Sequence, residues 1–276
     1  MQQRRRLNDI IILVCTLLLA VLFFFPIFFN IMSAFKSNAE IMKDAIAFPK
    51  SVYLESFKYL LTDTEYPKAI LNSLILTAVS ILFMILLIPM AGYAIERHDT
   101  KWTRFVFVFF LAGMMIPFQA YMIPLFRELK ILGLYGNLAG PVIIYISGSV
   151  GFGCLLYTSF LKGIPKEIEE SAEIDGCTKY GIFWRIVFPL LGPCTATLVV
   201  LNGLGIWNDF LMPMLVLPSG HTKTMIVEIF YYVGEFSSRW DMIFAGTTMS
   251  IVPILIIFLS LQKYFVKGIA SGAIKG

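Results

Sequence analysis

Long apolar segments separated by short polar ones make up most of this chain. Six of them are about 20 or more residues long, the length that a helix needs to cross the hydrocarbon core of a bilayer. The six segments cover residues 10–35, 69–95, 105–125, 138–161, 194–217 and 242–266. Backbone groups in hydrocarbon must find their hydrogen-bond partners inside the segment, so each is expected to be a helix. The pattern predicts an all-α membrane protein with six transmembrane helices in one domain, residues 1–276.

Proline lies inside or near the ends of five of these segments, as Pro26, Pro89, Pro117, Pro213 and Pro253. Each proline removes one helical hydrogen bond and is expected to kink its helix. Kinked helices suit a pathway that opens and closes, but they are equally common in static bundles. Both interpretations stay open at this point.

The composition indicates that the bilayer is the solvent of this chain. It is 58% hydrophobic and 14% charged, with a mean hydropathy of +0.79, whereas soluble domains average roughly 45–50% apolar and about 25% charged residues. The net charge of +4 is modest, and Lys and Arg gather at the ends of the apolar segments. That distribution is typical of a membrane protein and not of a nucleic-acid binder.

The residues that carry chemistry exclude several kinds of site. The four cysteines form no C-x-x-C pattern and none lies in a predicted outer loop, so neither a disulfide framework nor a metal site is expected. No G-x-x-x-x-G-K-[ST] phosphate-binding loop occurs. We therefore expect no cofactor to bind this chain; if it uses ATP, another subunit binds it.

The distribution of Lys and Arg predicts the orientation. If the six segments alternate, 13 of the 22 basic residues share one side with both termini, which the positive-inside rule places in the cytoplasm. The three arginines at positions 4–6 followed by an apolar run imitate a signal peptide, but the run is too long and lacks a cleavage site. It is therefore expected to be a retained first span in a bacterial or archaeal plasma membrane.

The segment 164–189 between the fourth and fifth spans has its own helix signals. Pro165 suits the first position of a helix, and acidic residues follow in the early turns, where the positive helix end favours them. Gly176 provides a stop. Beyond it, apolar residues recur at i, i+3, i+4 and i+7, and they are Tyr180, Phe183, Trp184 and Val187. We expect two short helices bent at Gly176, the second lying against the bundle and the first protruding.

This hairpin resembles a known signature. Glu170-Ser171-Ala172, three residues, Gly176, nine residues and 186–189 (I-V-F-P) resemble the E-A-A-x3-G-x9-I-x-L-P motif of binding-protein-dependent ABC importer permeases. Ser171 replaces the first alanine and Phe188 replaces leucine, and both changes are small. The W-N-D-F sequence at 207–210, the run 261–268 and the ending 273–276 resemble the carbohydrate branch, in particular its shorter, maltose-type permease with six spans.

The resemblance implies the type I ABC importer permease fold, in which this hairpin is the coupling helix that seats in a groove on a cytoplasmic ATPase. The residues expected to make this contact are Glu169, Glu170, Ser171, Ala172, Asp175 and Gly176. The partners implied are an ABC ATPase dimer that binds ATP and magnesium, a second permease subunit, an extracytoplasmic solute-binding protein and the lipid bilayer. The chain itself is then a transport subunit and not an enzyme, and the imported solute is a sugar or oligosaccharide.

Two further segments are interpreted through the resemblance. The tail 267–276 is expected to reach the ATPase through Lys275 and Gly276, although a frayed basic end near anionic lipid is an alternative. In the outer loop 218–240, the turn expected to meet the binding protein comprises Gly234, Glu235, Phe236, Ser237, Ser238 and Arg239. The aromatic residues Tyr231 and Tyr232 beside it are expected to form an interfacial belt.

Polar residues inside spans are the remaining candidates, because such residues are costly in a membrane. A possible translocation path comprises Gln119, Asn202, Asn208 and Asp209. Asp209 lies near the outer end of its span, where a charge can cap or pair, and this structural role is favoured over a sugar contact. In maltose-type importers the companion permease supplies most sugar contacts.

Other classes fit less well. A non-sugar solute such as a polyol or glycerol phosphate remains an alternative for the same machinery. An ion-coupled secondary transporter usually shows repeats and buried ionisable groups, and an ion channel shows a filter-like loop; neither is evident. An intramembrane hydrolase needs a buried base, yet His98 and His221 lie outside the spans.

Overall fold

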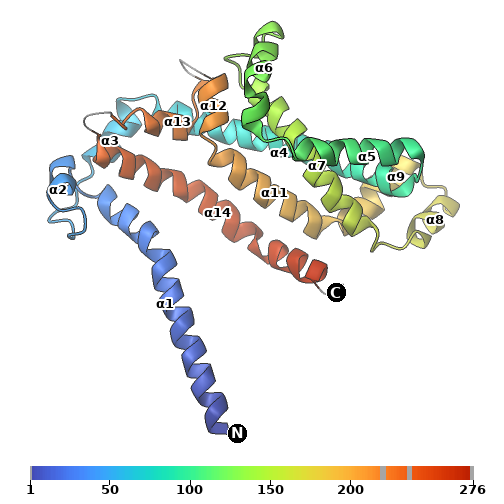
Figure 1. Ribbon diagram of the computed structural model, residues 1–276, viewed down its shortest axis with the longest axis horizontal. Helices are drawn as coiled ribbons and strands as arrows, with labels where there is room; N and C mark the ends of the chain where they lie inside the picture. Colours follow the sequence, from blue (N-terminus) through green and yellow to red (C-terminus); the bar gives the residue numbers. More distant parts are fainter. Residues whose placement is uncertain (1, 218–221, 235–237, 274–276) are drawn as a thin grey trace. The chain divides into compact units, whose positions relative to one another are not determined.

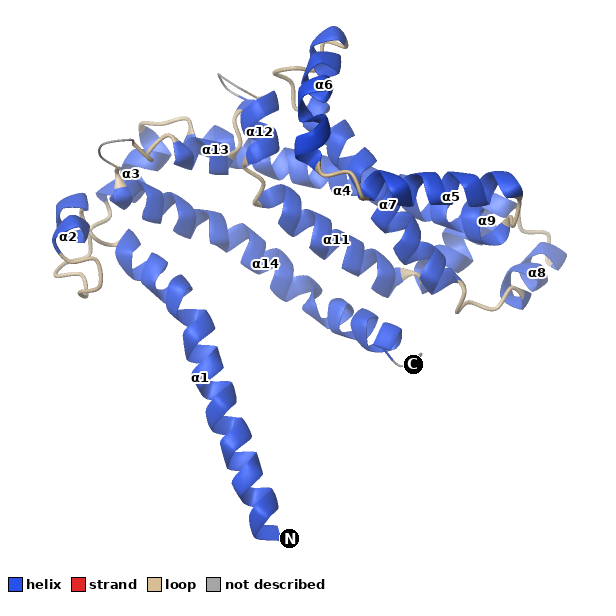
Figure 2. Cartoon of the chain, in the orientation of Figure 1, coloured by secondary structure: helices blue, strands red, loops and turns tan. Residues whose placement is uncertain are grey.

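The computed structural model describes residues 2–217, 222–234 and 238–273 (Figure 1). Throughout these ranges the ordered elements are helices, without a strand (Figure 2). The chain divides into two compact units, Met1–Pro67 with Glu228–Val252 and Lys68–Val227 with Pro253–Gly276. The all-α class expected from the apolar segments is confirmed.

The first unit is tied together by hydrogen bonds from α3 and from Tyr66 to the start of the last helix. Its helices are α1 (Gln2–Ala34), α2 (Asn38–Lys43), α3 (Glu55–Thr62) and the first part of α14 (Trp240–Ala273). The Ser56 hydroxyl donates to Asp241 at 3.0 Å, and the Tyr66 hydroxyl donates to the Gly246 carbonyl at 2.6 Å. Lys36 is fully buried and donates to the Ala45 carbonyl at 2.9 Å. These three polar side chains therefore have hydrogen-bond partners inside this unit.

The second unit holds the main apolar core. Its longer elements are α4 (Tyr66–Arg97, from Lys68 on), α5 (Lys101–Met114), α6 (Phe118–Ile131), α7 (Ala139–Leu161), α11 (Gly192–Trp207) and α12 (Leu211–Val216), followed by α13 (Met225–Phe230), which crosses into the first unit. Helix α7 lies beside both α5 and α11 (Figure 1). Buried Met84 and Ile88 of α4 meet Tyr157 and Leu161 of α7 and Leu198 of α11. This core supports the hairpin between α7 and α11.

Small residues bring α4 and α7 close together. A Cβ atom on Gly92 would lie 2.8 Å from Cβ of Tyr157, and a Cβ atom on Gly153 would lie 2.4 Å from Cγ2 of Ile88. Neither distance leaves room for a side chain. Inside a bilayer the hydrophobic effect does not drive helices together, because the lipid tails are as apolar as the side chains. Helices there usually associate by close packing at small residues.

The predicted spans correspond to helices, but two of them are broken. Three helices are long and apolar enough to cross a membrane, Asp9–Ala34, Tyr66–Arg97 and Ala139–Leu161. The expected span 105–125 is instead α5 and α6, bent by 103° across Met115–Pro117. Pro117 lacks an N–H and disfavours helical geometry in the residue before it, so the expected kink becomes a break.

The fifth predicted span is also interrupted. Helix α11 ends at Trp207 and α12 begins at Leu211, so 194–217 is not one helix. The hairpin helices Lys179–Leu190 meet Gly192–Trp207 at a bend of 74°. The last predicted span lies within α14, and Trp240–Ile256 is the apolar part of it among the residues whose side chains are described. Three spans, or five with the bent pairs joined, are thus found in the described residues, and six stays a prediction.

The close approach of α4 and α7 makes a testable prediction. Gly153→Ala is expected to lower the free energy of unfolding by about 1–3 kcal/mol, because the added methyl overlaps Ile88. Gly148→Ala on the same helix is the control, since a Cβ atom there meets nothing within 4 Å. Thermal unfolding in detergent, followed by tryptophan fluorescence, measures both. Equal stability of the two variants would contradict the packing described.

Candidate functional site

The hairpin consists of two helical segments with a left-handed residue between them. Helix α8 (Glu167–Ile174) is followed by Gly176 at φ +83°, then by α9 (Lys179–Ile182), a π-helical turn (Phe183–Val187) and α10 (Phe188–Leu190). The Cys177 N–H donates to the Ala172 carbonyl and the Gly176 N–H to the Glu173 carbonyl, both at 3.0 Å. This is a Schellman ending, in which glycine supplies the positive φ. Pro165 was expected at the first helical position, but α8 begins at Glu167 with Lys166 as its N-cap, so Pro165 precedes the helix.

The second segment of the hairpin packs against the helical core. Ile182, Phe183 and Val187 are buried there, and the Phe183 ring lies 5.1 Å from the Tyr93 ring of α4, centroid to centroid. Trp184 makes edge contacts with Phe183 and Phe188 at 4.8 and 4.9 Å. Tyr180, by contrast, is exposed. A chain of aromatic contacts thus runs from Tyr93 of α4 through Phe183 and Trp184 to Phe188.

Glu169 is held inside the chain. Its Oε1 lies 2.7 Å from Nη2 and 2.8 Å from Nε of Arg97, and its Oε2 accepts a hydrogen bond of 2.5 Å from the Tyr93 hydroxyl. Arg97 also donates to the Ile164 carbonyl at 3.0 Å. The Arg97 and Glu169 side chains are only 9% and 13% exposed. This cluster, which we call the α4–α8 latch, joins the last turn of α4 to the hairpin.

The latch was missed by sequence reasoning. Arg97 counted only as a basic residue that sets orientation, and Tyr93 was one aromatic residue among many in an apolar segment. The available signal was that Arg97 is the first basic residue after an apolar stretch of more than 25 residues. A charge of that kind either remains solvated or finds a partner on the nearest loop.

The residues expected to contact an ATPase divide between two faces of the hairpin. Glu169 is engaged in the latch and Ala172 is buried in the helical core. The exposed members are Glu170, Ser171, Asp175 and Gly176. The Ser171 hydroxyl donates back to the Glu167 carbonyl at 2.9 Å. The outward face therefore presents two acidic residues and two small ones, while the other face attaches the hairpin to its own bundle.

The turn 234–239, which is expected to meet the binding protein, is described only at its ends. The Gly234 N–H donates to Ser238 Oγ at 3.3 Å, and the Arg239 N–H donates to the Tyr232 carbonyl at 3.0 Å. The hydrogen bond that the Arg239 side chain donates to Asp241 raises the pKa of Arg239. Burial raises the pKa of Tyr232. Glu235, Phe236 and Ser237 lie outside the described residues, as do Lys275 and Gly276 of the tail.

A polar and aromatic pocket lies where α6, α7 and the start of α12 meet. It has a volume of about 340 Å³ and is lined by Phe118, Tyr121, Ile144, Tyr145, Gly148, Ser149, Asp209, Leu211 and Met212. We call it the α6–α7–α12 pocket. The Tyr145 hydroxyl donates to Asp209 Oδ2 at 2.9 Å, and the Met212 N–H donates to Oδ1 at 3.3 Å. Asp209 is thus both a backbone cap and a pocket wall.

The other candidates for a translocation path lie around this pocket. Asn202 accepts a hydrogen bond of 2.6 Å from Ser149, which lines the pocket. Gln119 is exposed between two lining residues of α6. Asn208 is exposed and donates to the Leu204 carbonyl at 2.9 Å. The structure therefore brings Asp209 and, through Ser149, Asn202 together at one pocket.

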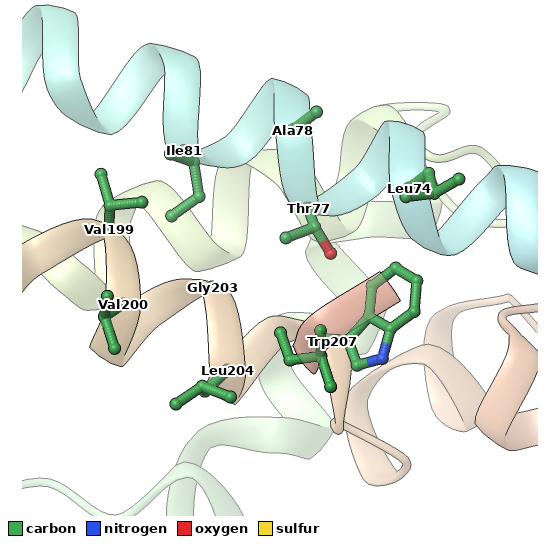
Figure 3. Close-up of a pocket in the computed structure, with 10 residues that line it drawn as sticks. Leu74, Thr77, Ala78, Ile81, Val199, Val200, Gly203, Leu204 and Trp207 are labelled. Atoms are coloured by element: carbon green, nitrogen blue, oxygen red, sulfur yellow. The ribbon is translucent and has the colours of Figure 1, made fainter. Parts of the chain in front are cut away.

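A second pocket, between α4 and α11, is almost entirely apolar. Its volume is about 160 Å³, and the side chains of Thr77 and Trp207 lie in it between the two helices (Figure 3). The rest of the lining is aliphatic, with Leu74, Ile81 and Val200 among the contributors. Such a lining offers little to a polar solute. The described residues contain no group of three or more side chains suited to a metal ion.

Comparison with known proteins decides the family. Residues 88–271 match the sequence profile of the family described as binding-protein-dependent transport system inner membrane component. This chain belongs to that family. The match contains the hairpin, the latch and the α6–α7–α12 pocket, so all three are features of a permease.

Curated relatives match nearly the whole permease. It is 35% identical over 258 residues, 93% of each chain, to the probable starch degradation products transport system permease protein AmyC of Thermoanaerobacterium thermosulfurigenes. It is 31% identical over 279 residues, 100% of each chain, to the multiple sugar-binding transport system permease protein MsmG of Streptococcus mutans. These identities confirm the family assignment along the full length.

Solved structures show the same fold. A chain from the crystal structure of a bacterial ABC transporter involved in the import of the acidic polysaccharide alginate aligns with a TM-score of 0.83 at 23% identity, covering 94% of the permease and 97% of that chain. A second alginate transporter structure, in complex with an alginate pentasaccharide-bound periplasmic protein, aligns with a TM-score of 0.67 at 21% identity, covering 93% and 94%. The type I importer permease fold is thereby confirmed.

The latch predicts a large difference between two arginines. Arg97→Ala is expected to lower the free energy of unfolding by about 3 kcal/mol, because it leaves Glu169 without its charged partner in a buried site. Arg104→Ala removes a pair with Asp99 whose side chains are 70% and 78% exposed, and surface pairs contribute about 0–1 kcal/mol. Thermal unfolding of the purified complex compares the two. Similar midpoints for both variants would show that the latch does not stabilise the permease.

Proposed function

We propose that this permease is the membrane-spanning subunit of an ATP-driven importer for a sugar or oligosaccharide delivered by an extracytoplasmic solute-binding protein. The observation that carries the proposal is the full-length similarity to permeases named for carbohydrate systems. Besides starch products and multiple sugars, a relative named for arabinooligosaccharide transport, AraQ of Halalkalibacterium halodurans, is 32% identical over 99% of this chain and 100% of its own. These names favour a saccharide over the polyol or glycerol phosphate alternative.

Coupling to a separate ATPase is assigned to the outward face of the hairpin. Glu170 is exposed beside the small Ser171, so a groove on the ATPase can approach the helix closely and offer a basic residue to the carboxylate. A charge-assisted hydrogen bond in such a partly desolvated place is stronger than a surface ion pair. ATP and magnesium are bound by that partner, and a second permease completes the pathway.

For Glu169 we propose a role other than direct contact with the ATPase: it attaches α8 to the end of α4 through the latch. Because Glu169 is bound to Arg97 and Tyr93, a displacement of α8 acts directly on the end of α4. On the other side of Gly176, the docked aromatic segment leads into α11 through the 74° bend. A single movement of the ATPase groove is therefore delivered to two helices. In this arrangement both termini and the hairpin face the cytoplasm.

Charge reversal on the outward face tests this coupling. Glu170→Arg is expected to lower ATP-driven uptake roughly tenfold or more, since it replaces an attractive contact by a repulsive one. The permease should still co-purify with its ATPase and second permease. Uptake into proteoliposomes and ATPase activity stimulated by the binding protein are measured together. Uptake should fall more than ATPase activity if the joint is uncoupled.

Glu128→Arg is the matched control, because Glu128 is exposed on α6, outside the hairpin. It makes the same charge change and should leave uptake unchanged. Wild-type uptake by Glu170→Arg would contradict the proposed joint. Loss of uptake in both variants to the same degree would show that net charge, and not position on the hairpin, is responsible.

A further inference from the structure

The α6–α7–α12 pocket has an aromatic wall and a polar wall, which match the apolar faces and the hydroxyl groups of a sugar ring. Phe118 and Tyr121 form an aromatic wall, with ring centroids 5.5 Å apart and planes at 83°. Asp209, Tyr145 and Ser149 form a polar wall. A sugar ring has C–H faces that pack on aromatic carbon and hydroxyl edges that hydrogen-bond. The volume of about 340 Å³ is within the range of about 300–1,000 Å³ for ligand pockets.

The hydrogen-bonding capacity of the polar wall is only partly used. Each Asp209 oxygen accepts one bond, from Tyr145 or from the Met212 N–H, and a carboxylate has about four acceptor sites in all. The Ser149 and Tyr145 hydroxyls donate to Asn202 and Asp209, so their oxygens keep lone pairs. The wall therefore accepts hydrogen bonds, and solute hydroxyl groups are the donors that suit it.

The charge of the pocket narrows the solute class. Among the described residues that line it, Asp209 is charged and none is Lys or Arg. An acidic sugar would bring its carboxylate towards that of Asp209, and two like charges at such short range repel each other. A neutral sugar brings only hydroxyl donors. The pocket thus favours neutral saccharides over uronic acids.

We propose that the α6–α7–α12 pocket binds one sugar unit of a neutral saccharide during translocation, with Tyr121 packing on the ring and Asp209 and Ser149 accepting its hydroxyl protons. The inference rests on the proposed importer function and goes beyond it. It assigns direct solute contact, and selection against acidic sugars, to this subunit. Asp209 then has a role besides capping α12.

The experiment uses the complete complex in proteoliposomes with its binding protein. The probes are malto-oligosaccharides, arabinooligosaccharides and raffinose as neutral saccharides, and alginate pentasaccharide as the acidic one. Wild-type complex should take up at least one neutral probe and not the acidic one. If no neutral probe is transported, the proposed importer function itself fails. If the acidic probe is transported as fast as the neutral one, the charge argument fails and the importer function stands.

Substitutions then test the pocket itself. Tyr121→Ala and Asp209→Asn should each lower uptake of the transported neutral probe roughly tenfold, the effect of losing one strong contact. ATPase activity stimulated by the binding protein should remain, since the asparagine side chain in Asp209→Asn retains an oxygen for the Met212 N–H. Ile123→Ala is the control, because Ile123 is on the same helix as Tyr121, 75% exposed and outside this pocket. Wild-type uptake by both Tyr121→Ala and Asp209→Asn would overturn the inference.

Discussion

The requirement that every backbone polar group in hydrocarbon be satisfied governs where this permease can depart from a helix. Irregular backbone at membrane depth is tolerated where it lines a cavity or is buried in protein. Two breaks interrupt predicted spans, at Met115–Pro117 and at Asn208–Phe210. The residues that follow them, Phe118 and Leu211, both line the α6–α7–α12 pocket. The pocket and the breaks are therefore one feature, in which Asp209 accepts the N–H of Met212 that the interrupted helix leaves free.

A series of hydrogen bonds joins this pocket to the region of the hairpin. Along α7 and the α11–α12 segment, Tyr157 donates to Thr195, Ser149 to Asn202 and Tyr145 to Asp209, at 2.9, 2.6 and 2.9 Å. The acceptors are seven residues apart; Thr195 and Asn202 lie on one face of α11, and Asp209 follows in the break after Trp207. Helices α7 and α11 are thereby held as a pair over most of their length. A movement applied near Thr195 reaches Asn202 through α11, and Asp209, in the break that follows, is held to α7 by the hydrogen bond from Tyr145.

Sequence reasoning reached the helical class, the family and the hairpin because each rests on local signals. The length of an apolar segment predicts a membrane span. Glycine readily adopts the positive φ with which α8 ends, and Gly176 has it. Sequence reasoning failed where one local signal is compatible with two different structures. Pro117 was expected to kink a helix and breaks it: the N–H groups of Met115 and Ile116 still bond back to α5, and a new helix starts at Phe118. Glu169 and Glu170 are chemically identical in sequence, and only the position of Arg97, 72 residues away, shows that one faces inward.

The inward position of Glu169 also bears on the coupling proposed for the hairpin. A coupling helix that touched the ATPase on one face and nothing on the other would yield on its own when the groove moves. Buried pairs such as Arg97–Glu169 add less net stability than their Coulomb attraction suggests, but they hold one geometry, because removing either partner is costly. Ala172 in the core and Tyr93 on the second carboxylate oxygen restrict the helix further. In the proposed coupling, a contact on the outward face of the hairpin can move α4 and α11 only if the inner face is held rigidly to them.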